Sequence, residues 1–377
     1  MGKPRKEDIS FMALGGGQSV GASCYFLQLG GQNILLDCGT GMKDGLIFAP
    51  DFRAPLETGI IDSLGEIPRI FISHAHMDHI GALPMFLKET SHAVVYMTEL
   101  TRFLAEAQLS RPRKASCGND NWLSQIATVS YLSSFDFLGY KVSFLPAGHI
   151  PGAMMTLFNF RGRNILYTGD YSVHASALTS GCSLPQEQVD ILLMCGLHAH
   201  HSDTCRGGGQ LSGLLSRMRR IFSAGRPISC HVHQLSKGVE FLTIFNRAFP
   251  DIPIYVDSGI MRIVDQFERV GIPIMKENIH HWTGGFIREP VHILTAAGEA
   301  REQPDGYVRI DTDFSLHDDF EDTAAFVKKI NPRVCVVVHS PFGRNGEEGA
   351  LELRLLHDAE CRTQVIYAEQ GEFYSLL

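Results

Sequence analysis

The sequence predicts an α/β protein with a main domain and an inserted second domain. Three observations support this prediction. Short apolar segments alternate with helical patterns, glycine turns join the first strands, and the composition changes near residue 197, where histidine, glycine and arginine become frequent. We expect residues 1–196 and 306–377 to form the main domain and residues 197–305 to form the insertion. A chain of 377 residues has room for both.

The composition is that of a soluble globular protein, with 44% hydrophobic and 20% charged residues. The sequence has neither an apolar run of membrane-spanning length nor a signal-peptide pattern, and its nine cysteines are scattered without paired spacing. We therefore expect a cytoplasmic protein with reduced thiols and no membrane partner. A net charge of −8 argues against a broad nucleic-acid-coating surface, although a local basic groove remains compatible with it.

The N-terminal segment alternates strand and turn. We predict strands over residues 10–14, 23–29 and 33–37, paired as antiparallel hairpins through glycine turns. The third strand ends at Asp37. This aspartate is either a solvated strand end or, together with the histidine motif that follows, an outer support of a metal site.

The most informative segment is Phe71–Pro84, FISHAHMDHIGALP, which follows a short apolar strand. Four potential metal ligands stand within six positions: His74, His76, Asp78 and His79. In a tight turn His-x-His projects two imidazoles to one side, and the Asp-His pair can reach a second point. The motif therefore suits two adjacent cations of a zinc-like kind, with iron or manganese also tolerated. Ordinary solvated loop histidines are the alternative, which this dense run disfavours.

Two more candidate ligands follow strands later in the domain. After helices predicted over 82–88, 99–110 and 121–133 and a strand over 93–97, His149 follows a strand over 142–146. Asp170 follows a hairpin over 154–159 and 164–167. At these strand ends the imidazole can approach the metals, and the carboxylate is suited to bridge them.

The insertion is predicted to hold a parallel sheet flanked by helices. Strands over 228–233, 252–256 and 291–295 alternate with helices over 211–224, 237–248 and 262–270. Four basic residues here are candidate contacts for a substrate backbone: Arg217, Arg219, Arg220 and Lys237.

The C-terminal segment returns to candidate site residues. His317 precedes a helix over 321–330, and a strand over 334–338 leads to His339. Either histidine alone would be uninformative. Strands over 364–368 and 373–377 complete the chain.

Taken together, these motifs resemble the metallo-β-lactamase superfamily and, within it, the β-CASP nucleases. Asp37 matches the first superfamily motif, His74–His79 the second, His149 the third and Asp170 the fourth. His317 in FSLHDD and His339 in VVVHSP match β-CASP motifs B and C. The resemblance implies an αββα sandwich that carries an inserted β-CASP domain.

The resemblance also implies a two-zinc site, with manganese as a possible substitute. It assigns His74, His76 and His149 to one ion, and Asp78, His79 and His339 to the other. Asp170 would bridge both ions, and a water activated by the two metals would attack the phosphodiester. His317 would stabilise the phosphate or protonate the leaving oxygen, with Asp78 also counted among the catalytic residues.

The sequence departs from the β-CASP pattern in the insertion and before it. Cys195 occupies the position of the motif A acid, and Gly196-Leu197 replaces the usual Ser-Thr pair. Ser236-Lys237 stands where Gly-Arg is expected. Because the acid orients the motif B histidine in the family, these departures bear on the proton-donor step. Four residues are candidates to replace the acid: His198, His200, His201 and Asp203.

The resemblance predicts a ribonuclease, because a histidine at motif C accompanies β-CASP enzymes that act on RNA. The expected substrate is single-stranded RNA, and protein partners in an assembly would supply affinity that the acidic chain lacks. Two alternatives stay open. One keeps the metals but acts on DNA ends, a nucleotide or another small phosphodiester; the other is a metal-bound scaffold subunit without catalysis.

Overall fold

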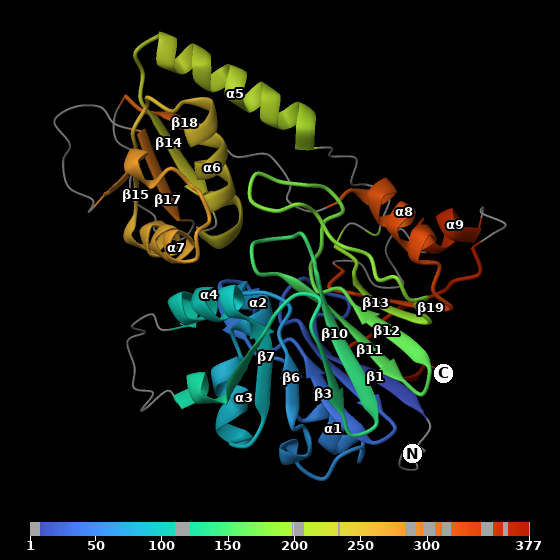
Figure 1. Ribbon diagram of the computed structural model, residues 1–377. Helices are drawn as coiled ribbons and strands as arrows, with labels where there is room; N and C mark the ends of the chain where they lie inside the picture. Colours follow the sequence, from blue (N-terminus) through green and yellow to red (C-terminus); the bar gives the residue numbers. More distant parts are fainter. Residues whose placement is uncertain are drawn as a thin grey trace. The chain divides into compact units, whose positions relative to one another are not determined.

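The computed structural model describes residues 8–109, 121–197, 199, 207–232, 234–282, 292–296, 306–310, 318–340, 350–356 and 361–376. The chain divides into two compact units (Figure 1). The first comprises Met1–His174, Gly181–Thr204 and His317–Leu377, and the second comprises Ala175–Ser180 and Cys205–Leu316. A short segment that precedes the insertion in sequence thus belongs to the second unit.

The first sheet of the first unit has the strand order β21-β1-β2-β3-β6-β7-β8. Its strands are β1 (Ile9–Gly15), β2 (Cys24–Leu29), β3 (Gln32–Leu36), β6 (Arg69–Phe71), β7 (Val94–Thr98), β8 (Ile126–Val129) and β21 (Phe373–Ser375). The predicted hairpins are confirmed, because β1, β2 and β3 pair antiparallel. From β3 to β8 the pairing is parallel.

The second sheet has the order β20-β19-β13-β12-β11-β10-β9. Its strands are β9 (Ser134–Phe137), β10 (Tyr140–Pro146), β11 (Met154–Phe160), β12 (Arg163–Tyr167), β13 (Ile191–Cys195), β19 (Val334–Val338) and β20 (Gln364–Tyr367). Like the first sheet, it has an antiparallel part and a parallel part. Strands β9 to β12 pair antiparallel, and strands β12, β13, β19 and β20 pair parallel. Since β10 and β12 both run antiparallel to β11, strands β10, β12, β13 and β19 share one direction.

The two sheets pack face to face around one apolar core. Phe71 of the first sheet stacks on Tyr96 and meets Phe158 of the second sheet with ring centroids 5.2 Å apart. Every residue of β13 and β19 is buried, so the outer face of the second sheet is covered as well. Burial on both faces explains why the predicted strand 334–338 reads as an unbroken apolar run.

Helices lie on the outer sides of the sheets and complete the predicted αββα layering (Figure 1). The helices α1 (Ala54–Glu57), α2 (Met77–Ile80), α3 (Leu83–Glu89) and α4 (Glu99–Leu109) accompany the first sheet, and α8 (Phe320–Ile330) and α9 (Ala350–Leu356) accompany the second. Short 3₁₀ turns span Leu64–Glu66 and Asn121–Gln125, and a separate hairpin pairs β4 (Gly41–Lys43) with β5 (Leu46–Phe48).

The helix predicted over 121–133 is wrong. Only Asn121–Gln125 is helical, as a 3₁₀ turn, and Ile126–Val129 forms β8, which pairs parallel with β7. Ile126, Thr128 and Val129 are β-branched, and such side chains favour a strand. The pairing partner β7 is distant in sequence, so local helical spacing could not reveal it.

The second unit holds a five-stranded sheet of order β16-β15-β17-β14-β18, parallel throughout, which confirms the predicted parallel sheet. Its strands are β14 (Ile228–Val232), β15 (Ile254–Val256), β16 (Ile279–His281), β17 (His292–Ala296) and β18 (Val308–Ile310). Its helices are α5 (Gly207–Ser223), α6 (Val239–Ala248) and α7 (Ser258–Arg269), with a π-helical turn at Gln234–Gly238 and a 3₁₀ turn at Lys276–Asn278.

Glu240 of α6 ties residues 175–180 to the rest of the second unit. Its buried carboxylate accepts hydrogen bonds from the backbone N–H of Ala177 and from the hydroxyl of Ser176. Burial raises the pKa of Glu240, and these two donors partly offset that effect. In the part of the chain that the structure describes, no helix has the length and apolar character needed to cross a membrane.

Candidate metal centre

The candidate site residues follow the carboxyl ends of strands. Asp37 follows β3, and the segment His74–His79 begins three residues after β6. In the second sheet His149, Asp170 and His339 follow β10, β12 and β19, which run in one direction. Strands that share a direction end at the same edge of a sheet, so the topology brings these side chains together.

The structure gathers His74, His76, His149 and Asp170 into one group, whose ligand atoms lie within 4.8 Å of one another. Nδ1 of His76 lies 2.9 Å from Nε2 of His74 and 3.3 Å from Nε2 of His149. Oδ2 of Asp170 lies 4.0 Å from His74 Nε2 and 3.8 Å from His149 Nε2. Three imidazoles and one carboxylate form a donor set suited to one divalent ion.

A second group comprises Asp78, His79 and His339. Oδ2 of Asp78 lies 3.9 Å from Nε2 of His79 and 3.7 Å from Nε2 of His339. Asp170 faces this group as well, with Oδ1 3.5 Å from His79 Nε2. The two oxygens of one carboxylate therefore address two ligand groups, as a bridge between two ions requires.

The side chains of the cluster do not satisfy all of one another's hydrogen-bonding groups, and a metal ion would. Asp170 is 3% exposed, yet its Oδ1 accepts no hydrogen bond from the residues described. A buried carboxylate oxygen without such a donor is costly. A divalent ion at this point would satisfy it.

Asp37 and two serines orient three of the imidazoles. Nδ1 of His79 donates to Asp37 at 2.7 Å, and Nδ1 of His339 lies 2.8 Å from Ser23 Oγ. Ser73 Oγ donates to Asp37 at 2.7 Å and accepts from Nδ1 of His74 at 2.9 Å. With Nδ1 engaged, each of these rings presents Nε2 to the cluster, so the hydrogen bonds set the coordinating tautomer.

Burial and opposite charge shift the pKa values of the cluster in both directions. Burial, reinforced by neighbouring imidazoles, lowers the pKa of His74 well below its usual value, so this ring is neutral. Burial opposes the charged form of His79, but Asp170, Asp37 and Asp78 outweigh it and raise the pKa to about 10. Burial also disfavours the Asp170 carboxylate, but the imidazoles around it hold its pKa well below the usual range.

Metal loading at pH 7 is therefore expected to release about one proton from His79. Without metal His79 is an imidazolium, because pH 7 lies below its pKa of about 10, and a metal ligand must be neutral. This single ionisation should contribute a rise in apparent affinity of roughly tenfold per pH unit between pH 7 and 9. Calorimetry in buffers of different ionisation heat measures the released proton; heats that are the same in every buffer would contradict this assignment.

Gly169 allows the backbone to pass Ser73 just before Asp170. Its φ is +54°, and a Cβ at this position would lie 2.3 Å from Cβ of Ser73. A side chain here is therefore excluded both by backbone conformation and by space. The hairpin turn offers a matched position, since Gly162 has φ +77° and a Cβ added there would have nothing within 4 Å.

Gly169→Ala is expected to lower both stability and metal affinity, whereas Gly162→Ala should lower stability alone. Each variant forces alanine into the left-handed region at a cost of about 1–2 kcal/mol. Only the first displaces Ser73, which we expect to weaken metal binding at least about 10-fold. Thermal unfolding and chelator competition measure the two effects. Equal metal affinities of the two variants would show that Ser73 does not need its present position.

Several predicted site residues belong to the second unit or lie outside the described residues. His317 lies outside them, as do His198, His200, His201 and Asp203. The four basic candidates belong to the second unit: Arg217, Arg219 and Arg220 are exposed on α5, and Lys237 is half-buried. Arg217 donates to the backbone carbonyl of Arg309 at 3.4 Å within that unit.

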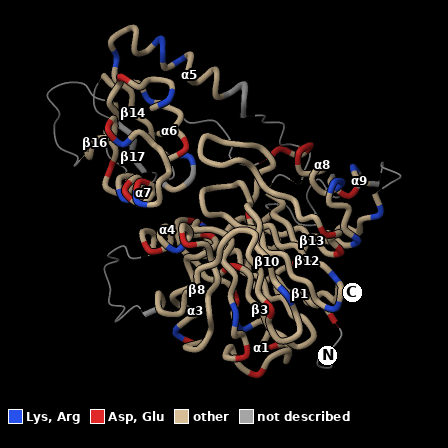
Figure 2. The backbone as a smooth tube through the Cα atoms, in the orientation of Figure 1, with Lys and Arg blue, Asp and Glu red and all other residues tan. Residues whose placement is uncertain are grey.

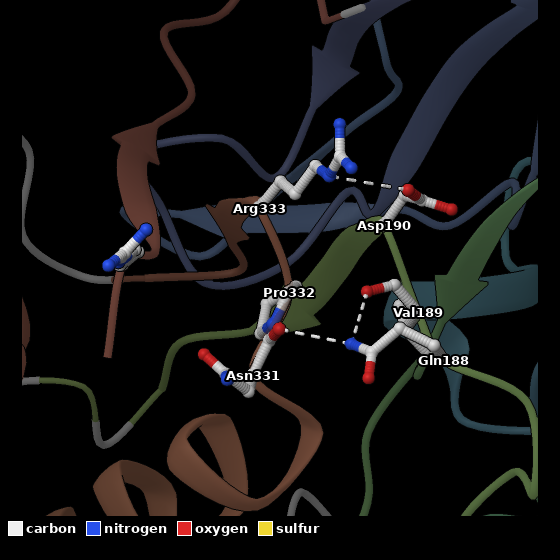
Figure 3. A pocket seen from close by; sticks show the side chains of 7 residues that line it. Gln188, Val189, Asp190, Asn331, Pro332 and Arg333 are labelled. Carbon is white, nitrogen blue, oxygen red and sulfur yellow. Dashed lines mark hydrogen bonds and ion pairs between the residues drawn. The ribbon is translucent and has the colours of Figure 1, made fainter. Parts of the chain in front are cut away.

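A separate pocket of about 590 Å³ lies at the other end of the second sheet (Figure 3). Asp190 and Arg333, which stand just before β13 and β19, line it, whereas the metal cluster follows the far ends of these strands. Asp190 accepts a hydrogen bond from Arg163 at 2.9 Å and lies 3.6 Å from Nε of Arg333. Asp190 is thus paired with two arginines in structural ion pairs, and we assign no chemistry to this pocket.

Comparisons with known proteins agree with this fold and site. Residues 18–182 match the family described as the metallo-beta-lactamase superfamily. The chain is 25% identical to cleavage and polyadenylation specificity factor 73 of Drosophila melanogaster over 94% of its own length and 62% of the relative. It is 30% identical to the probable RNase MJ4 of Methanocaldococcus jannaschii, over 66% of this chain and 59% of the relative. It is 26% identical to endoribonuclease YSH1 of Gibberella zeae, over 72% of this chain and 35% of the relative.

The chain thus spans less than two thirds of the length of these relatives. A crystal structure of a protein of unknown function from Enterococcus faecalis V583 shares the fold, with a TM-score of 0.62 and 14% identity over 97% of this chain and 99% of that one. Residues 18–182 thus carry a metallo-β-lactamase domain, and its His/Asp cluster can hold divalent metal ions. The names of these relatives agree with the β-CASP resemblance of its motifs.

Proposed function

We propose that the protein is a zinc-dependent ribonuclease that hydrolyses phosphodiester bonds of single-stranded RNA. The observation that carries the proposal is the position of Asp170, whose two oxygens face the two ligand groups. Histidine and carboxylate donors suit zinc, although they also admit manganese. The names of the three relatives, two of them an RNase and an endoribonuclease, support RNA as the substrate class.

The choice of RNA over DNA also draws on His339, which stands at the position of motif C. Its ring is 2% exposed and held by Ser23, so that Nε2 faces Asp78 at 3.7 Å. This placement makes it part of the second ligand group. In the family a histidine at this position accompanies action on RNA.

The chain's own residues would bind and orient the reacting groups. Two divalent ions at this site would lower the pKa of a water molecule and offset the charge of the phosphate. Asp78 and Asp170 supply two negative charges to the site, and the serine and aspartate partners keep Nε2 of three imidazoles free for coordination. His317 would protonate the leaving oxygen. Its neighbour in sequence, Asp318, accepts from Ser172 Oγ and from the Val173 N–H, two and three residues after Asp170.

We expect His317→Ala to retain the metals and to reduce turnover about 10²–10⁴-fold, the usual contribution of a general acid. His76→Ala should instead abolish metal binding and cleavage together, since Nδ1 of His76 lies within 3.3 Å of two neighbouring ligand nitrogens. Metal content and single-turnover cleavage separate the two effects. If His317→Ala cuts RNA at the wild-type rate, another group donates the proton.

The C-terminal half of α5, which carries Arg217, Arg219 and Arg220, is the candidate contact for the RNA backbone. Figure 2 shows basic positions towards the C-terminal end of this helix, where Arg219 and Arg220 are exposed. Because the whole chain carries a net charge of −8, we propose that partner proteins supply additional RNA affinity. Steep salt dependence of RNA binding by the isolated chain would support the α5 contact.

Cleavage of labelled single-stranded RNA and the matching DNA, with zinc or manganese and with metal content measured on the same sample, tests the proposal. RNA cut, DNA spared and about two metals per chain would support it. Cleavage of mononucleotide esters but of neither polymer would favour a small phosphodiester. Bound metals without any cleavage, including in the presence of cell extract, would favour a scaffold.

A further inference from the structure

Cys195 ends a strand between the two strands that deliver Asp170 and His339. β13 pairs on one side with β12 and on the other with β19, and Cys195 is opposite Val338, the residue before His339. Its backbone N–H donates to Thr168 Oγ1 at 3.2 Å, and the N–H of Gly196 donates to the carbonyl of Val338 at 2.7 Å. The end of β13 is therefore fixed on both sides.

The side chain of Cys195 faces the metal cluster. Its Sγ, a carboxylate oxygen of Asp170 and a ring nitrogen of His339 all lie within 4.8 Å of one another. Cys195 is 8% exposed, and Asp170 beside it is 3% exposed with Oδ1 accepting no hydrogen bond from the described residues. A thiolate, a carboxylate and an imidazole that converge in a buried place are the donor types of a zinc site.

We propose that Cys195 is a thiolate ligand of the ion held by Asp78, His79 and His339. Binding exchanges the thiol proton, which leaves to solvent, for the metal. Zinc accepts thiolate, imidazole and carboxylate donors together, so the residues that face this ion would suit it. The proposal rests on the metal pair proposed above, but it does not depend on RNA cleavage.

The proposed ligand predicts a preference among metals. Thiolate donors select zinc and other soft or borderline ions, whereas carboxylate donors suit manganese and magnesium. A thiolate among the donors should therefore favour zinc over manganese for the second ion. Cys195→Asp should move the preference of the second ion from zinc towards manganese.

Cobalt absorption spectroscopy of the full chain tests the assignment directly. Cobalt(II) bound to a thiolate gives a near-ultraviolet charge-transfer band that nitrogen and oxygen donors do not give. We expect this band in the wild type, its loss in Cys195→Ser, and its retention in Cys335→Ser, a buried cysteine of the neighbouring strand that belongs to no ligand group among the described residues. Cobalt bound without the band, or a band that survives in Cys195→Ser, would overturn the proposal.

Cadmium-113 NMR of the wild type provides a measurement that needs no variant, in case Cys195→Ser does not fold. A resonance shifted downfield by a sulfur donor supports the proposal, and two resonances typical of nitrogen and oxygen donors alone overturn it. Spectra that show a sulfur ligand, together with no RNA cleavage, would contradict the proposed ribonuclease function but support Cys195 as a ligand. RNA cleavage without a sulfur signal would support the ribonuclease function and contradict Cys195 as a ligand.

Discussion

Asp170→Asn is expected to remove at least one metal ion from the protein and to reduce cleavage by about 100-fold or more. This loss should exceed that caused by mutating a residue that only hydrogen-bonds to a metal ligand. The carboxylate faces both ligand groups, with its two oxygens 3.5 Å from His79 and 3.8 Å from His149. Asparagine keeps the shape but provides only one oxygen and no charge. It cannot bridge two ions or offset their charge.

A matched control for this variant is Asp190→Asn, in the same sheet. Asp190 also pairs with basic side chains, Arg163 and Arg333, but it stands at the beginning of β13, away from the cluster. We expect this control to retain full metal content and activity. Metal analysis and RNA cleavage are measured on both variants. A wild-type metal content in Asp170→Asn would show that the carboxylate bridges nothing.

The clustering of the candidate ligands was predictable because histidine and aspartate runs of this kind are conspicuous in sequence. Histidine and aspartate directly after apolar strands have little role in packing, and the segment His74–His79 is too dense in such residues to be an ordinary turn. The topology explains why the rest could be added. His149, Asp170 and His339 follow strands that share one direction, and therefore lie at one edge of a sheet.

The residues that orient the ligands were not predicted, apart from Asp37. Ser23 and Ser73, together with Tyr167, whose hydroxyl donates to Asp37, carry neutral hydroxyl groups. Such groups are common in strands and turns and indicate no chemistry by themselves. Their roles depend on distances between segments far apart in the chain, such as Ser23 and His339. The position of Ser73 directly before His74 was the only local signal for this set.

The strands that the sequence did not reveal are mostly edge strands. β8, β9, β16 and β18 each lie at the end of a sheet, and most of their residues are half-buried or exposed. An edge strand lacks the continuous apolar run that marks a central strand such as β19, so local composition does not distinguish it from a loop or a short helix. Its partner strand determines its conformation.

Asp37→Asn is expected to weaken metal binding about 10–100-fold, although Asp37 belongs to neither ligand group. Its buried carboxylate accepts four hydrogen bonds: from the N–H of Ser73 at 2.6 Å, from Ser73 Oγ at 2.7 Å, from His79 Nδ1 at 2.7 Å and from the Tyr167 hydroxyl at 2.5 Å. Asn tolerates the φ of +56° found here, so the backbone should persist. In either orientation, however, its amide N–H₂ faces at least one of these donors.

Each buried donor left without an acceptor costs roughly 1–3 kcal/mol, so Asp37→Asn should also destabilise the metal-free protein. Tyr167→Phe removes one donor and leaves the carboxylate in place, and we expect it to cost only about 1 kcal/mol with little change in metal affinity. Chelator competition gives the affinity and denaturant unfolding the stability of each variant. The orienting role of Asp37 fails if its asparagine variant binds metal as tightly as Tyr167→Phe does. It holds if affinity falls only where the acceptor of His79 and Ser73 is lost, because these two contacts fix which ring nitrogen meets the metal.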